Sequence, residues 1–187
     1  MPTAAEYEAQ IALLDWNGLR ALWSAIEQRD TPGWDAGKAL EYLVIRAFQL
    51  DGAQVRWPYR VLLFGEEVEE IDGAVHCYGL SCLVESKDLI GDVATGPIAK
   101  LRNQLLRRPA GTVGVLFSRT EFTDAAWLLA HLALPQAILL WTGVEIENML
   151  VQERACDLLL AKYRFCVEEG LPDYDVRERE IQWPPIF

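Results

Sequence analysis

The sequence has few of the residues that build zinc clusters and disulfide frameworks. It holds only two histidines and four cysteines, and no two cysteines stand in C-x-x-C spacing. A zinc cluster is not expected, because such clusters need several histidine or cysteine ligands at short spacings. Cys77 and Cys82 would be diagonal neighbours in a hairpin, too far apart for a bridge. Cys156 and Cys166 would lie on nearly opposite sides of a helix. We therefore expect reduced thiols.

Long apolar runs and a secretion signal are also missing. The longest apolar stretch, Ala125–Trp141, is interrupted by His131, Pro135 and Gln136, whereas a membrane span needs about 20 apolar residues. The start, Met1–Gln10, is acidic and has no apolar run of the kind that signal peptides carry. We therefore expect a cytoplasmic protein with no membrane partner.

Basic residues are scarce as well. Lysine and arginine number 17 against 28 aspartates and glutamates, which gives a net charge of −11 at pH 7. This net negative charge argues against a protein that binds nucleic acid on its own through its overall charge. The exception is the segment Ile98–Arg108, which reads as a helix and carries Lys100, Arg102, Arg107 and Arg108. We interpret it as a nucleic-acid-binding helix facing phosphates, with a solubilising face as the alternative.

The composition of the chain is that of a globular α/β protein. Its 187 residues are 51% hydrophobic and 24% charged, enough to bury a core of their own. We expect an N-terminal helix within residues 1–30, a core domain over 31–150, and a C-terminal helix with an irregular tail over 151–187. The apolar runs Gly111–Ser118 and Gln136–Thr142 read as buried strands. The expected architecture is a central mixed sheet of four to five strands flanked by helices.

Caps and breakers set the limits of the first helices. Thr3 and Glu6 fit a capping box, and one helix is expected to continue from there through Ile26, ending before Gly33. A second helix is expected to end at Leu50, because Asp51-Gly52 follows it. A first strand is expected directly after that helix.

A hairpin is expected within the stretch Glu69–Asp88. Its two strands would meet at a tight turn at Tyr78-Gly79, since glycine tolerates the positive φ that such turns need. This register places Asp72 directly opposite Glu85, with about 5 Å between the Cβ atoms. Two carboxylates at that distance repel each other and raise each other's pKa unless a cation lies between them.

The same register adds a lysine to the two acids. It places Glu70 opposite Lys87, and Lys87 shares a strand face with Glu85 because the two are two residues apart. An ordinary solvent-facing hairpin with two cross-strand pairs is the plain alternative. The apolar run Leu80–Val84 instead favours a buried strand that ends in the acid and the lysine. The pattern indicates a metal site.

Five segments, taken in order, resemble the PD-(D/E)XK nuclease superfamily, most closely its Mrr-like restriction endonuclease branch. They are Gly37–Val44 (GKALEYLV), Ile71–Gly73 (IDG), Glu85–Lys87 (ESK), Phe117–Ala126 (FSRTEFTDAA) and Leu139–Leu150 (LLWTGVEIENML). The chain departs from the usual pattern in having Ile71 where proline commonly precedes the aspartate. It also carries Glu85 where many Mrr-like proteins carry glutamine. The resemblance implies a restriction-endonuclease-like three-layer fold.

The resemblance also implies a division of roles among the site residues. Asp72 and Glu85 would hold Mg²⁺, for which Mn²⁺ is expected to substitute, with help from the main-chain carbonyl of Ser86. Glu41 would complete this site or support a second metal, although its place at the edge of an apolar helix face also suits a surface residue. Lys87 would orient or deprotonate the attacking water and offset phosphate charge.

Further partners follow from the same resemblance and from the charge. Gln104 is a candidate helper residue on the basic helix. DNA is the expected substrate, and a protein partner or a second subunit is expected to supply basic surface. The tail Gly170–Phe187, which ends in apolar residues, is the candidate for that contact.

Three functions are compatible with these patterns. The first is a Mg²⁺-dependent DNA endonuclease, for instance of a restriction or defence system. The second is a catalytically inactive nuclease-fold interaction module in a larger complex. The third is an unrelated α/β enzyme with a coincidental acidic hairpin, but neither a glycine-rich phosphate loop nor a Ser-His-Asp set is present to support it.

Overall fold

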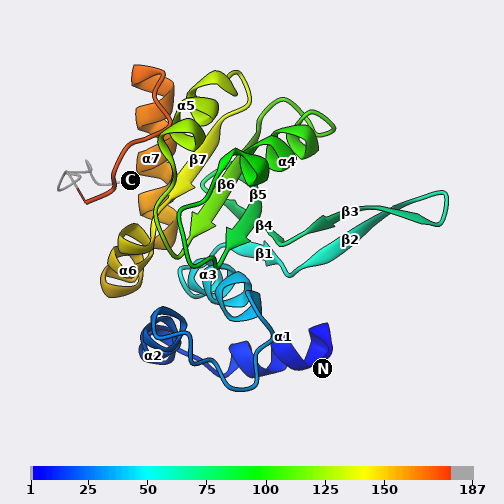
Figure 1. Cartoon of the computed structure of the whole chain (residues 1–187), viewed down its shortest axis with the longest axis vertical. Coiled ribbons are helices and arrows are strands. Elements are labelled where there is room, and N and C mark those ends of the chain that lie inside the picture. Colours follow the sequence, from blue (N-terminus) through cyan, green and yellow to red (C-terminus); the bar gives the residue numbers. More distant parts are fainter. Residues whose placement is uncertain (1, 178–187) are drawn as a thin grey trace.

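A computed structural model describes residues 2–177 of the chain. The helices are α1 (Ala4–Ala12), α2 (Trp16–Glu27), α3 (Lys38–Leu50), α4 (Thr95–Leu105), α5 (Asp124–Leu132), α6 (Gly143–Gln152) and α7 (Ala155–Glu169). The strands are β1 (Gln54–Arg56), β2 (Tyr59–Leu63), β3 (Glu66–Ile71), β4 (Gly73–Cys77), β5 (Leu80–Lys87), β6 (Thr112–Ser118) and β7 (Ile138–Trp141). Figure 1 shows how these elements are arranged.

Five of the strands form one central sheet in the order β1-β4-β5-β6-β7. β1, β4 and β5 pair antiparallel, whereas β5, β6 and β7 pair parallel, so the sheet is mixed. The parallel strands β6 and β7 are buried along nearly their whole length, which explains their continuous apolar runs. The predicted α/β architecture, a mixed central sheet flanked by helices, is confirmed.

Alternating side chains of the strands divide the core between two helical layers. Val75, Val84 and Val115 join the cluster that includes residues of α1, α2, α3, α6 and α7. Leu83 and Leu116 point to the other face, where α4 and α5 cover them. The result is a helix–sheet–helix sandwich, visible in Figure 1. The two N-terminal helices therefore belong to the same core as the sheet.

The N-terminal segment forms two helices where a single one was predicted. The capping box at Thr3 is present, with the Thr3 backbone N–H donating to Glu6 Oε2 at 2.6 Å. The helix stops at Ala12 because Asp15 begins a new one, its side chain accepting from the Gly18 backbone N–H at 2.9 Å. Asp is a strong N-cap, so its side chain favours a helix start here over a continuous helix.

The predicted register of the β4–β5 hairpin is confirmed. Gly73 pairs with Val84, and Cys77 pairs with Leu80 next to the turn. Tyr78 and Gly79 both have positive φ, 49° and 81°. Positive φ at both central residues matches the right-handed twist of the flanking strands. The local turn sequence was therefore enough to predict the register.

The predicted start of this hairpin was wrong. β3 does not continue β4 in the central sheet but pairs with β2 in a separate two-stranded ribbon. Glu70 consequently lies opposite Arg60 and not opposite Lys87. The run of glutamates in β3 is too polar for the buried sheet, and the ribbon leaves much of it exposed. Figure 1 shows the ribbon projecting from the body.

Two further features complete the described chain. Among residues 2–177, no helix is long and apolar enough to cross a membrane. The segment after α7 packs back onto the body through Tyr174 and Val176, which are buried. The predicted partner contact of the tail falls largely on residues 178–187, which lie outside the described residues.

Candidate metal and nucleic-acid site

The site is built where the central sheet meets the ribbon. Asp72 is the bend between β3 and β4, and Glu85 lies near the end of β5. One further step of the β4–β5 register places the two side by side, and Asp72 Oδ2 accepts from the Ser86 backbone N–H at 2.8 Å. Both side chains are buried, with residue exposures of 7% for Asp72 and 0% for Glu85. The sheet therefore brings the two predicted acids together.

A close helix–strand contact brings α3 to the same place. A Cβ atom on Gly73 would lie 2.5 Å from Ile45 Cδ1 of α3 and 3.1 Å from the Arg56 carbonyl oxygen. Only glycine leaves room for this approach. Because Gly73 directly follows Asp72, α3 is held against the start of β4, and Glu41 in its first turn can act on Asp72.

In the metal-free site, the ionised form of the Asp72 carboxyl is disfavoured. Burial and the charges of Glu85 and Glu41 together raise its pKa to about 7, against the opposing effects of Lys87 and the Ser86 N–H. A buried carboxyl beside other acids is a group that a cation would stabilise in its ionised form. Such a perturbed acid is also typical of functional sites.

Two lysines hold the Glu85 carboxylate. Lys87 Nζ lies 2.5 Å from Glu85 Oε1, and Lys100 Nζ lies 2.7 Å from Oε2 and 2.9 Å from Oε1. Lys87 Nζ also donates to the Ser86 carbonyl oxygen at 2.9 Å. Although burial lowers the pKa of Lys100, its hydrogen bonds to Glu85 and the charge of that residue raise it overall. Lys100, assigned from sequence to DNA contact, thus lies within the acidic site.

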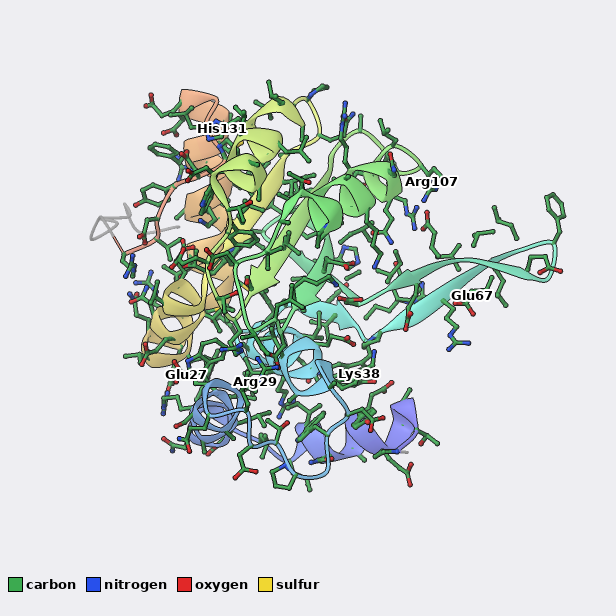
Figure 2. All side chains as sticks on the ribbon, in the orientation of Figure 1. Glu27, Arg29, Lys38, Glu67, Arg107 and His131 are labelled. Atoms are coloured by element: carbon green, nitrogen blue, oxygen red, sulfur yellow. The ribbon has the colours of Figure 1, made fainter. Side chains whose placement is uncertain are left out.

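Glu41 has a lysine partner of its own. Lys38 Nζ lies 2.6 Å from Glu41 Oε2 and 4.0 Å from Glu70 Oε1. Burial raises the pKa of Glu41 by more than the Lys38 hydrogen bond lowers it. Figure 2 shows Lys38 on α3 near the base of the ribbon and Glu67 farther out along it. Lys38 was not predicted as a site residue, although its i,i+3 spacing to Glu41 is a signal of an ion pair on one helix face.

Arg107 and Arg108 were predicted to belong to the basic helix, but α4 ends at Leu105 and the two arginines lie in the turn that follows it. Arg107 and Arg108 both bind the buried carboxylate of Glu69 on β3. Burial raises the pKa of Glu69, but the hydrogen bonds from the two guanidinium groups lower it overall. Figure 2 shows Arg107 at the end of α4 on the side of the ribbon. These two arginines hold the base of the ribbon against the end of α4.

The other two predicted residues of α4 differ in environment. Gln104 is buried, and its side-chain nitrogen donates to the Glu70 carbonyl oxygen at 3.2 Å. It supports the strand that leads into Asp72. Arg102 is half-buried on the same helix.

The oxygen atoms in this region suit a hard divalent cation. Asp72, Glu85 and the Ser86 carbonyl supply only oxygen donors, and Mg²⁺ prefers oxygen and keeps several of its waters. Among residues 2–177, no three His, Cys, Asp or Glu side chains are grouped closely enough to hold a metal ion. Asp72 and Glu85, with the Ser86 carbonyl and water, are a donor set of the kind that Mg²⁺ accepts. The role of Glu41 as a further ligand stays a prediction.

Without metal, ionisation of Asp72 is expected to lower the free energy of unfolding as pH rises. Its folded pKa of about 7 lies above the ordinary value of 3.8. Between these values the folded protein keeps a proton that the unfolded chain has released, so stability falls with rising pH. The loss begins near pH 4 and reaches on the order of 4 kcal/mol above pH ~7.

Urea unfolding of the wild type and of Asp72→Asn, with a chelator present, measures this effect. Asparagine keeps an oxygen for the Ser86 N–H but cannot ionise. The variant should match the wild type near pH ~4 and be more stable near pH ~8. Other titrating groups, such as Glu69, cancel in the difference. A difference that does not change with pH would contradict the raised pKa of Asp72.

Comparison with known proteins gives few matches. Neither a protein-family model nor a curated protein matches the chain. The MspJI restriction endonuclease, solved in complex with a 27-mer oligonucleotide, is similar over 92% of this chain and 40% of that one, at 17% identity and a TM-score of 0.44. The DNA modification-dependent restriction endonuclease AspBHI is similar over 86% of this chain and 42% of that one, at 16% identity and a TM-score of 0.42. The chain spans less than half of either protein. The Mrr-like branch stays a prediction.

Proposed function

We propose that this chain is a Mg²⁺-dependent endonuclease that hydrolyses phosphodiester bonds of DNA. The observation that carries the proposal is the buried pair Asp72 and Glu85 beside Lys87. Asp72 has a raised pKa in the absence of a cation, and Glu85 is held by ammonium groups. A buried acid whose ionised form lacks full compensation is suited to bind a divalent cation, and the neighbouring ammonium groups are suited to the phosphate that accompanies it.

The residues of the chain have separable tasks in this proposal. Asp72 and Glu85 would hold Mg²⁺, which when bound acidifies water and stabilises charge on the phosphate. Lys87, fixed by the Ser86 carbonyl and Glu85, positions the attacking water and offsets the charge that develops on the phosphate. Lys100 pairs with Glu85 in the metal-free chain and would become available to a phosphate oxygen if a cation took its place at that carboxylate. Asp72 would hold the cation in its ionised form.

The binding surface for DNA is proposed to be incomplete in one chain. The net charge is −11, and Arg107 and Arg108 are occupied by Glu69. We therefore propose that a protein partner or a second copy supplies basic surface. A role in restriction or defence is proposed with it, on the strength of the resemblance of the five segments.

Incubation of the purified protein with supercoiled duplex DNA tests the proposal. Nicked and linear products are expected with Mg²⁺ or Mn²⁺, and none with a chelator. The matched control is Asp72→Asn, which keeps the Ser86 hydrogen bond and should bind less metal. Absence of cleavage together with absence of Mn²⁺ binding by calorimetry would defeat the proposal.

A second function is favoured by one observation. The carboxylate of Glu85 is already satisfied by Lys87 and Lys100, an arrangement that also stabilises a fold without any metal. A catalytically inactive nuclease-fold interaction module could keep it. A folded protein that neither binds Mn²⁺ by calorimetry nor cleaves DNA would favour this alternative over the endonuclease.

A further inference from the structure

A cavity at the turn of the β4–β5 hairpin brings together two cysteines from distant parts of the chain. Its volume is about 390 Å³, and Cys77 of β4 and Cys156 of α7 both line it. The turn is fixed against α7, because the Tyr78 hydroxyl donates to Asp157 Oδ1 at 2.9 Å. The cavity lies at the end of the hairpin away from Asp72 and Glu85, so it is separate from the candidate nuclease site.

The two thiols that line this cavity have different environments. The hydrogen bond from Cys156 lowers the pKa of Cys77, while the same bond and burial raise the pKa of Cys156. Cys77 is half-buried and Cys156 is buried. A half-buried thiol that lines a cavity, with a buried second thiol lining the same cavity, is the arrangement of a reactive cysteine and its resolving partner.

The position of Cys156 is fixed by the end of α3. Its backbone N–H donates to Asp51 Oδ2 at 2.7 Å, and its sulfur lies 3.7 Å from the Asp51 carbonyl oxygen. These contacts hold the first turn of α7 in place. Cys156 is therefore kept next to Cys77 by the fold, and not by local sequence.

The other two cysteines have no such environment. Cys82, diagonal to Cys77 on the hairpin, is 2% exposed, and burial raises its pKa to about 12. Burial also raises the pKa of Cys166, which belongs to the core. Neither of these two thiols lines the cavity that Cys77 and Cys156 share. They provide internal controls within the same chain.

We propose that Cys77 and Cys156 form a thiol-oxidation site at which a hydroperoxide converts the pair to a disulfide. The Cys77 thiolate sulfur attacks a peroxide oxygen, which forms an S–O bond and breaks the O–O bond; the departing hydroxide takes up a proton. The Cys156 sulfur then attacks the Cys77 sulfur, forming the S–S bond as the S–O bond breaks, and water leaves with the Cys156 proton. Overall, two thiols and hydrogen peroxide give one disulfide and two waters.

The bridge would join β4 to α7 across a long loop of the chain. Such cross-links restrict the unfolded state, and long loops gain most. The oxidised protein should therefore melt at a higher temperature than the reduced one, by on the order of 5–10 °C. Nuclease activity is not needed for this effect, so the inference stands apart from the proposed function.

Treatment of the purified protein with hydrogen peroxide, followed by intact mass measurement without reductant, tests the proposal. We expect a mass loss of about 2 Da, the loss of two of the four free thiols, and a Cys77–Cys156 peptide in a non-reducing digest. Dithiothreitol should reverse all three changes and the rise in Tm. The double variant Cys82→Ala/Cys166→Ala should behave like the wild type.

The single variant Cys156→Ser separates the two steps. It should stop at a Cys77 sulfenic acid, which dimedone captures, because no resolving thiol remains. A wild-type protein that only gains oxygen, or that forms its bridge through Cys82 or Cys166, would overturn the proposal. So would an intramolecular bridge that persists in Cys156→Ser.

Discussion

Replacement of Lys87 by methionine should lower metal-dependent cleavage by roughly 10²–10³-fold, the usual effect of removing one group that stabilises developing charge. The ammonium group of Lys87 contacts both Glu85 and the Ser86 carbonyl oxygen, so it has one defined position at the site. Methionine keeps the length of the side chain and removes only the charge and the donors. The fold should persist, because Lys100 still binds Glu85.

The measurement separates chemistry from metal binding. Single-turnover cleavage at saturating Mg²⁺ should show the loss, while Mn²⁺ affinity by calorimetry should be unchanged or improved, since a competing cation is gone. Glu85→Gln should instead lose metal affinity. Arg29→Met, which removes one positive charge from an exposed residue far from the acids in sequence, is the control for net charge. Equal cleavage by Lys87→Met and the wild type would remove Lys87 from the mechanism.

Replacement of Lys162 by methionine should destabilise the fold by about 3–5 kcal/mol, the cost of leaving a buried charge without its partner. Lys162 is 0% exposed, and its Nζ lies 2.8 Å from Glu145 Oε1 and donates to the Tyr174 carbonyl oxygen. Glu145 also accepts from the Val176 backbone N–H and caps α6 through the Thr142 backbone N–H. This network ties the segment after α7 to α6.

Urea unfolding measures the loss, and a second variant isolates its cause. Lys162→Met combined with Glu145→Gln should recover part of the stability, because no uncompensated carboxylate remains. The matched control is Arg164→Met on the same helix, whose pair with Glu168 at 3.9 Å is exposed at both side chains. That change should cost at most about 0.5 kcal/mol. A similar loss in Arg164→Met and Lys162→Met would contradict the importance of burial.

The sequence by itself determined the features that depend on near neighbours. The Tyr78-Gly79 turn fixed the hairpin register, and therefore the placing of Asp72 beside Glu85, because a tight turn allows only one pairing. The apolar runs of β6 and β7 predicted buried strands, since strands covered on both faces carry few polar residues. Thr3 and Glu6 predicted the first helix start.

Local patterns did not predict the pairing of β3, a polar segment that could have joined either the central sheet or a separate ribbon. No local pattern indicates that the chain leaves the sheet at Asp72, and β3 was assigned to the wrong partner. β3 pairs with β2 outside the sheet because its glutamates could not be buried there, apart from Glu69, which Arg107 and Arg108 after α4 neutralise. That choice depends on a segment later in the chain.

Only the tertiary structure decided which cations meet which acids and which thiols meet each other. Lys100 reaches Glu85 because α4 crosses β5, and Lys38 faces the site because α3 is pressed onto Gly73. Cys156 meets Cys77 because α7 begins against the hairpin turn. Side chains so far apart in sequence are brought together by helix packing on the sheet, and periodicity within a single segment carries no information about that packing.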